Sequence, residues 1–306
     1  MNNEIPKPNF FIIGAPRCGT TAMSEYLRQH PRIGFADPKD SSFFATDMPK
    51  LRLVDTMDDY LNKYFGHCAG QDYLAIGDGS VWHLYSKVAV RNILQFDPQA
   101  RFIMMIRNPI ELCRALYEIQ YELLWEDQPS FERAWRLQAE RYRGQRVPRL
   151  CRDARLLRYG EIGRLGEQLE RVCKLIPSHQ RLVIVFDDFV RDPAGAYSQV
   201  LAFLQVPHDG RKEFPKIAEG KRVRNRKLFE WASYPPEWAM SIVSRAKRRV
   251  GIQKLNILPK IRAWLISPRL RKPEISEQLK QEMRMHFAED IDRLSAVLNR
   301  DLSHWK

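Results

Sequence analysis

The residues best placed to do chemistry lie in one loop, residues 14–21, which reads GAPRCGTT. Backbone N–H groups in such a loop, together with the N-terminus of a following helix, can cradle a phosphate. Gly14 and Gly19 have the spacing of an ATP-binding loop, but Thr20 stands where that loop needs lysine. The positive charge comes three residues earlier, at Arg17, within reach of an oxygen that bridges a phosphate to a transferable group. The loop predicts a nucleotide 5′ end and chemistry other than that of Mg-ATP.

An alternation of apolar strands with helices must position this loop. Continuous apolar runs that end in turn residues are typical of parallel strands covered on both faces. We expect strands at residues 9–14, 73–77, 101–106 and 181–186. We expect helices after them at residues 19–30, 88–96, 110–124 and 194–204. This order predicts an α/β, P-loop-like, three-layer fold with a central parallel sheet flanked by helices.

The length favours a single domain over residues 1–306, because 306 residues with 44% hydrophobic content can bury one large core. Helical patterns near 125–180 and 229–306 predict additions on the substrate side of the sheet. Residues 266–268, Ile-Ser-Pro, are expected to break the second helical stretch.

The formal charge of +13 predicts a surface that attracts anions. Charge alone does not distinguish among the possible anionic ligands: nucleotides, nucleic acid, acidic lipid and sulfated sugar. The sequence carries no aromatic-basic repeat of a nucleic-acid module, so no nucleic-acid partner is expected. The basic stretch 247–272 contains Trp264, and it indicates either weak contact with a membrane surface or, as we prefer, a solvated basic face.

The cysteines indicate a reducing compartment. Their odd number and the lack of CxxC spacing favour free thiols over a disulfide framework. We identify no signal peptide, and no apolar run approaches the roughly 20 residues that span a bilayer. We therefore expect a cytoplasmic protein. The five cysteines are Cys18, Cys68, Cys113, Cys151 and Cys173.

The loop sequence Pro-Arg-Cys-Gly-Thr-Thr resembles the 5′-phosphosulfate loop of the PAPS-dependent sulfotransferases of bacterial and carbohydrate type. In that family a Lys or Arg precedes x-Gly-Thr-Thr, and the donor is 3′-phosphoadenosine 5′-phosphosulfate (PAPS). The resemblance implies a PAPS donor and no metal. The residues that it assigns to the donor are Arg17, Cys18, Gly19, Thr20 and Thr21.

Residues 38–44, PKDSSFF, resemble the family segment Lys-Glu-x-x-Phe-Phe. Its Glu is the catalytic base of carbohydrate-type members, so the resemblance gives Asp40 this role and places Lys39 in the substrate site. A hydroxyl needs such a group, because it is a poor nucleophile until a nearby carboxylate accepts its proton. From the residues alone, Asp40 is equally well explained as a solvated loop acid or a helix cap.

Residues 77–85, GDGSVWHLY, resemble the family stretch Gly-Glu-x-[Ser/Thr]-x-x-Tyr-Leu. The stretch follows an expected strand, and ligands bind parallel sheets at the carboxyl ends of their strands. We therefore expect Asp78, Ser80 and Trp82 to line the substrate site. His83 is an alternative general base, because imidazole titrates near neutral pH, or else a structural histidine.

Arg107-Asn-Pro resembles the 3′-phosphate motif of the family, in which a Ser follows eight residues after the Arg. Arg107 is expected to hold the 3′-phosphate, which suits a guanidinium. Ala115 occupies the position of the Ser and cannot donate a hydrogen bond, so one phosphate contact is missing. Arg114 is the candidate substitute.

Residues 220–228 resemble the basic family loop that closes over the nucleotide, with Arg224 and Asn225 as its ligands. The whole resemblance implies sulfuryl transfer from PAPS to an acceptor hydroxyl or amine by in-line displacement, with a carboxylate base. The acceptor, whether a small molecule, lipid or glycan, is not indicated. Three alternatives remain: a polyanion-binding protein, a P-loop kinase that lacks its lysine, and a sulfotransferase-like fold without catalysis.

Overall fold

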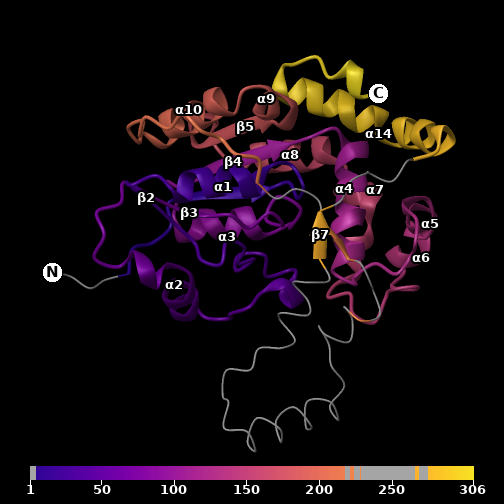
Figure 1. The fold of residues 1–306 in the computed structure, drawn as a ribbon, viewed down its shortest axis with the longest axis horizontal. Coiled ribbons are helices and arrows are strands. Elements are labelled where there is room, and N and C mark those ends of the chain that lie inside the picture. The colour runs from indigo at the N-terminus through magenta and orange to yellow at the C-terminus, as the bar shows by residue number, and fades with distance from the viewer. Residues whose placement is uncertain (1–4, 218–220, 224–227, 229–265, 269–274) are drawn as a thin grey trace, which may run out of the picture.

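A five-stranded parallel sheet with the order β2-β3-β1-β4-β5 forms the centre of the protein (Figure 1). The computed structural model describes residues 5–217, 221–223, 228, 266–268 and 275–306. The sheet is flanked by helices, which confirms the expected α/β, P-loop-like fold. The strands are β1 Phe10–Gly14, β2 Ile33–Phe35, β3 Ala75–Asp78, β4 Arg101–Ile106 and β5 Arg181–Val185.

The central strand β1 is buried along its whole length, as its continuous apolar sequence predicts. Phe10 pairs in register with Gly77 of β3 and with Arg101 of β4. A Cβ atom on residue 77 would stand 2.2 Å from Cζ of Phe10. Gly77 is therefore required for the Phe10 ring to pack against β3.

The four expected helices begin and end within two residues of the expected positions, whereas Met57–Phe65 and Phe186–Arg191 form two helices that were not predicted. The edge strand β2 was not predicted, because three residues that include a glycine show no periodicity. Helix α9 directly continues β5, so its first residue lies at the same edge of the sheet as the other strand ends. The main helices are α1 Thr20–Arg28, α2 Met57–Phe65, α3 Ala89–Phe96, α4 Pro109–Glu122, α9 Phe186–Arg191 and α10 Pro193–Leu204.

Residues 125–180 are less helical than expected. Residues 143–153 form turns and irregular loop, because this stretch contains Gly144 and Pro148 and lacks an apolar period. The helices of this region are short, and Figure 1 shows α5 and α6 beyond α4 and α7. They are α5 Phe131–Arg136, α6 Gln138–Tyr142, α7 Tyr159–Ile162 and α8 Leu165–Cys173.

A buried ion pair lies within this region, and the side chain of Gln120 joins the region to α4. Arg141 is fully buried and donates two hydrogen bonds to Glu126, at 2.5 and 2.6 Å. The Tyr159 hydroxyl donates to the same carboxylate at 2.8 Å. The amide of Gln120 on α4 donates to the Leu156 carbonyl at 2.5 Å. These contacts pair the buried charges and connect the region to the C-terminal half of α4.

The C-terminal helix α14, Glu277–Leu298, packs along α8 (Figure 1). Its Asp290 accepts hydrogen bonds from the backbone N–H groups of Gly166 and Glu167, at 2.8 and 2.9 Å. Residues 266–268, where a break was expected, form strand β7, Ile266–Pro268, which pairs antiparallel with β6, Lys221–Val223. The rest of the basic stretch 247–272 lies outside the described residues. The single-domain organisation stays a prediction.

Within the described ranges, no helix combines the length and the apolar character needed to cross a bilayer.

Candidate functional site

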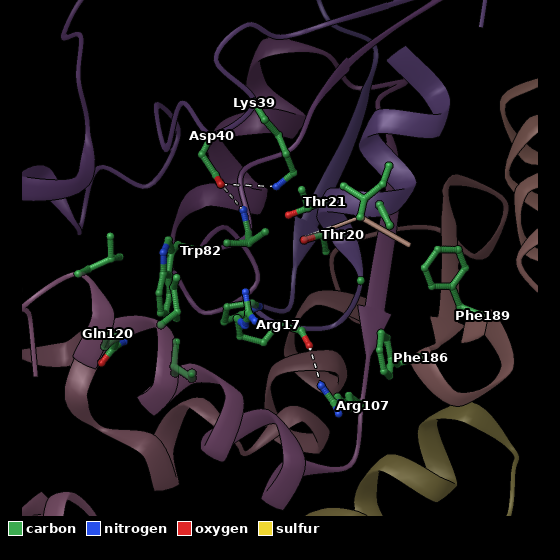
Figure 2. Close-up of a pocket in the computed structure, with 18 of the residues that line it drawn as sticks. Arg17, Thr20, Thr21, Lys39, Asp40, Trp82, Arg107, Gln120, Phe186 and Phe189 are labelled. Atoms are coloured by element: carbon green, nitrogen blue, oxygen red, sulfur yellow. Dashed lines mark hydrogen bonds and ion pairs between the residues drawn. The ribbon is translucent and has the colours of Figure 1, made fainter. Parts of the chain in front are cut away.

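A cleft of about 820 Å³ opens at the carboxyl ends of the parallel strands (Figure 2). Its lining includes a residue from the segment that follows each strand: Arg17 after β1, Asp40 after β2, Trp82 after β3, Arg107 after β4 and Phe186 after β5. Strands β2 and β3 lie on one side of β1, and β4 and β5 lie on the other. The cleft is therefore at the point where the strand order reverses, which is where ligands bind in open α/β sheets.

The loop after β1 has a backbone conformation suited to an anion. Arg17 and Gly19 both have left-handed φ angles, 64° and 86°. A Cβ on residue 19 would lie 3.0 Å from the Phe189 ring, so this position favours glycine. Thr20 begins α1, and its backbone N–H is among those without an intrahelical acceptor. Arg17, Gly19, Thr20 and Thr21 line the cleft.

Cys18 is not one of the described residues that line the cleft, unlike its neighbours in the loop. It is fully buried, and burial raises the pKa of its thiol to about 12. At neutral pH the side chain is therefore a protonated core residue, and only its backbone can take part in ligand binding.

Arg17 is a half-buried cation. Its Nε has no hydrogen-bond partner within the described part of the chain. Burial lowers the pKa of Arg17, and nearby Arg107 adds to this effect while Glu118 and Glu122 oppose it. An anionic ligand would favour the charged form of this side chain.

Arg107 lies next to Arg17 on the side away from Asp40 (Figure 2). Its guanidinium donates a hydrogen bond to the Arg17 carbonyl at 3.3 Å and lies over the Phe186 ring, 4.5 Å from the centroid. It also pairs with Glu111 at 3.4 Å. Two arginines are thus brought together at one edge of the sheet.

Arg114 does not replace the missing Ser in the cleft. Its guanidinium is bound to Glu111 and lines a separate cavity of about 240 Å³. Asn108 caps α4 by accepting from Ile110 N–H at 2.9 Å, and its amide donates to the Trp305 carbonyl at 3.5 Å. The C-terminal residues thereby support the turn that carries Arg107.

Asp40 and Lys39 lie on the opposite side of Arg17 from Arg107 (Figure 2). The Asp40 side chain is 47% exposed and lines the cleft. Its Oδ1 accepts from the Val81 backbone N–H at 3.0 Å, and its Oδ2 lies 3.5 Å from Lys39 Nζ. Lys39 also donates to the Gly79 carbonyl at 2.7 Å. The carboxylate is held in place while one edge stays open to solvent.

Asp78 and Ser80 are fully buried behind the Asp40 loop and do not line the cleft, contrary to expectation. Asp78 accepts hydrogen bonds from the hydroxyls of Ser41 and Tyr60, at 2.6 and 2.8 Å. The Ser80 hydroxyl accepts from the N–H groups of Ser41 and Ser42, at 3.0 and 2.9 Å. The two side chains therefore position the loop that presents Asp40. Trp82, in contrast, lines the cleft as expected.

His83 is also buried, and neither of its ring nitrogens has a hydrogen-bond partner among the described residues. Its ring packs edge-on against Phe44, with centroids 6.0 Å apart. Burial lowers the pKa of His83, although the carboxylates of Asp78, Asp40 and Asp47 oppose the shift. Of the two candidate bases, the one that lines the cleft is Asp40.

Several cleft residues were not predicted. Phe186 and Phe189 lie on the other side of Arg17 from Trp82 and Gln120 (Figure 2). The position of Phe186 directly after an apolar strand is a signal that could have identified it. The remaining unpredicted side chains come from helices and loops without a motif. Arg224 and Asn225 lie outside the described residues. Across the described ranges, no group of three His, Cys, Asp or Glu side chains is placed to hold a metal ion.

A sulfotransferase domain model matches residues 7–294. The chain belongs to the sulfotransferase family. The crystal structure of a sulfotransferase from Alicyclobacillus acidocaldarius superposes on this sulfotransferase with a TM-score of 0.71, at 23% identity. The superposition covers 98% of this chain and 99% of that one. The family and the fold implied by the sequence resemblance are thereby confirmed.

Two curated relatives match shorter segments of this sulfotransferase. Membrane-associated sulfotransferase kil1 of Dictyostelium discoideum is 22% identical over 118 residues, which cover 39% of this chain and 24% of that protein. Human carbohydrate sulfotransferase 15 is 27% identical over 143 residues, which cover 34% of this chain and 26% of that protein. The chain thus spans about a quarter of the length of these relatives.

Replacement of His83 should change how stability depends on pH. The native imidazole resists protonation, so the unfolded chain takes up a proton below its pKa of about 6.5 and stability falls as pH decreases. The His83→Leu variant should lose less free energy of unfolding between about pH 7 and pH 5 than the wild type, as measured by urea denaturation.

The matched control is His179→Leu, because His179 is exposed. The pKa of His286 is also lowered by burial, and this residue contributes equally to the pH dependence of stability in all three proteins. Parallel pH profiles for the wild type and His83→Leu would show that His83 is not a neutral buried imidazole.

Proposed function

We propose that this sulfotransferase moves a sulfuryl group from PAPS to an acceptor hydroxyl. The observation that supports a PAPS donor is the pairing of Arg17 and Arg107 at the strand ends, joined through the Arg17 carbonyl. The positive charge of Arg107 lowers the pKa of Arg17, and a ligand that brings a phosphate to each arginine would offset this effect. The half-buried Arg17, whose Nε has no hydrogen-bond partner among the described residues, fits such a ligand.

The cleft has a group for each part of PAPS. Arg17, Thr20 and the N-terminal N–H groups of α1 would hold the 5′-phosphosulfate. Arg107 would hold the 3′-phosphate, with one contact fewer than usual because Ala115 has no hydroxyl. The rings of Phe186 and Phe189 offer an aromatic wall for the nucleoside.

When bound, PAPS supplies a sulfuryl group whose bond to the 5′-phosphate oxygen breaks as its bond to the acceptor oxygen forms. Asp40 accepts the proton of the acceptor hydroxyl, because its open edge faces the cleft. Lys39 and the Val81 N–H orient this carboxylate. Arg17 stabilises the charge that develops on the phosphate oxygen.

A polyanion binder is a weaker account of the same residues. Such a protein neutralises many phosphates from an open, solvated surface. Here the Arg107 side chain is 15% exposed, and the Arg17 Nε is inaccessible to solvent. A concave site with convergent polar groups fits a small ligand better. We also propose a cytoplasmic location, because the five cysteines are free thiols.

Binding of adenosine 3′,5′-bisphosphate tests the donor site. Isothermal titration calorimetry should show magnesium-independent binding, weakened about 10- to 100-fold in both Arg17→Ala and Arg107→Ala, because each removes a charged hydrogen bond worth about 1.5–3 kcal/mol. Arg143→Ala is the control, since Arg143 is exposed and does not line the cleft. No binding at millimolar nucleotide would overturn the proposal.

Replacement of Asp40 tests the base. Asp40→Asn keeps an oxygen that can accept from Val81 N–H but cannot take up the acceptor proton. With any acceptor found by screening, kcat should fall about 10²- to 10⁴-fold, while nucleotide affinity stays unchanged. His83→Leu serves as the comparison and should retain turnover. Undiminished turnover in Asp40→Asn, measured by mass spectrometry of the product, would contradict the assignment.

A further inference from the structure

The cleft has a second arm, opposite the phenylalanine wall. Figure 2 shows Trp82 and Gln120 on the far side of Arg17 from Phe186 and Phe189. Helix α4 contributes residues at spacings of three and four, which place them on one helix face. We name this part the acceptor arm. We assign to it the cleft residues Leu53, Trp82, Gln120, Leu123, Trp125 and Arg152.

The walls of the acceptor arm are mainly hydrocarbon. Leu53 and Leu123 are 47% and 39% exposed although they line a concave site. Exposed leucines scattered singly need no explanation, but two in one concave cleft beside two indole rings form a surface that binds apolar groups. Covering these side chains with a ligand would remove apolar area from water.

The polar side chains of this arm are few and largely engaged. The Gln120 amide donates to the Leu156 carbonyl at 2.5 Å and accepts from the Tyr159 hydroxyl at 3.3 Å. Its side chain is therefore committed to the protein. A glycan carries a hydroxyl on most carbons, and each buried hydroxyl without a partner costs free energy. The described walls do not supply those partners.

Arg152 is the exception, because it lines the same cleft and carries a positive charge. It is exposed, and its guanidinium lies 5.5 Å from the centroid of the Trp125 ring. Among the described residues, no carboxylate lies within 4.0 Å of it, whereas neighbouring Arg155 is paired with Asp153 at 2.6 Å. A free guanidinium over an indole suits a planar carboxylate.

We propose that the acceptor is a hydroxylated hydrocarbon, alkyl or aryl, that carries a carboxylate at its far end. The acceptor hydroxyl donates a hydrogen bond to Asp40, and the apolar body of the acceptor packs on Leu53 and Leu123. The carboxylate of the acceptor forms an ion pair with Arg152. This assignment rests on the proposed function. The product is a sulfate ester, and the acceptor proton passes to Asp40.

The test first separates the two proposals. Wild-type protein is titrated with adenosine 3′,5′-bisphosphate, and failure to bind overturns the proposed function and the acceptor class with it. Protein that binds is then incubated with PAPS and one of three probes: an ω-hydroxy dodecanoate, a hydroxyphenyl alkanoate or a chondroitin oligosaccharide. Sulfation of either hydroxy acid, followed by mass spectrometry, supports the acceptor class, and the two acids distinguish an alkyl from an aryl body.

Two results with nucleotide-competent protein would overturn the acceptor class alone. One is sulfation of the chondroitin oligosaccharide in preference to both hydroxy acids, which would indicate a glycan acceptor. The other is sulfation of none of the three probes.

Variants of the arm then test how the acceptor binds. Leu53→Gln and Leu123→Gln should each raise KM for the sulfated probe about tenfold with kcat within about twofold, because contact with the apolar body is lost. Leu74→Gln is the matched control, since Leu74 is 45% exposed and lies outside the cleft. Equal effects of all three substitutions would overturn the apolar contact.

The ion pair between Arg152 and the acceptor carboxylate is tested by comparing the free acid with its methyl ester. Arg152→Gln should raise KM about tenfold for the free acid and leave KM for its methyl ester unchanged, because only the acid carries the charge. An equal change for acid and ester would overturn the role of Arg152.

Discussion

The hydrogen bond from Arg107 to the Arg17 carbonyl joins the loop after β1 to the end of β4. It brings two cations together where the strand order reverses, and the left-handed backbone at Arg17 presents the loop to the cleft. Phe186 lies under the Arg107 guanidinium and limits its access to water. The rest of the site is arranged around this pair, with the phenylalanine wall on one side and Asp40 on the other.

Two buried polar networks hold the walls of the cleft. Asp78 and Ser80 fix the loop that carries Asp40, and their hydrogen bonds are satisfied by backbone N–H groups and hydroxyls rather than by ligand. The Arg141–Glu126 pair and Tyr159 fix the segment that meets α4. Buried networks of this kind are costly when partly satisfied, so each keeps its wall in one position.

Apolar runs and one glycine loop were sufficient to predict four strands, four of the helices after them and the loop after β1 that lines the cleft. Strand β2 was missed because it is too short to show a pattern. Asp78 and Ser80 were misplaced because a strand end indicates where a residue lies but not which way its side chain points. Leu53, Gln120 and Arg152 come from segments without a motif, and only the tertiary fold brings them to the cleft.

The placement of a nucleotide between Arg17 and Arg107 is tested most directly by a crystal structure of the complex with adenosine 3′,5′-bisphosphate. We expect the 5′-phosphate within hydrogen-bond distance of Arg17 and the backbone at Thr20, and the 3′-phosphate on Arg107. A nucleotide bound outside this cleft, or inside it without contact to either arginine, would contradict both the donor site and the mechanism built on it.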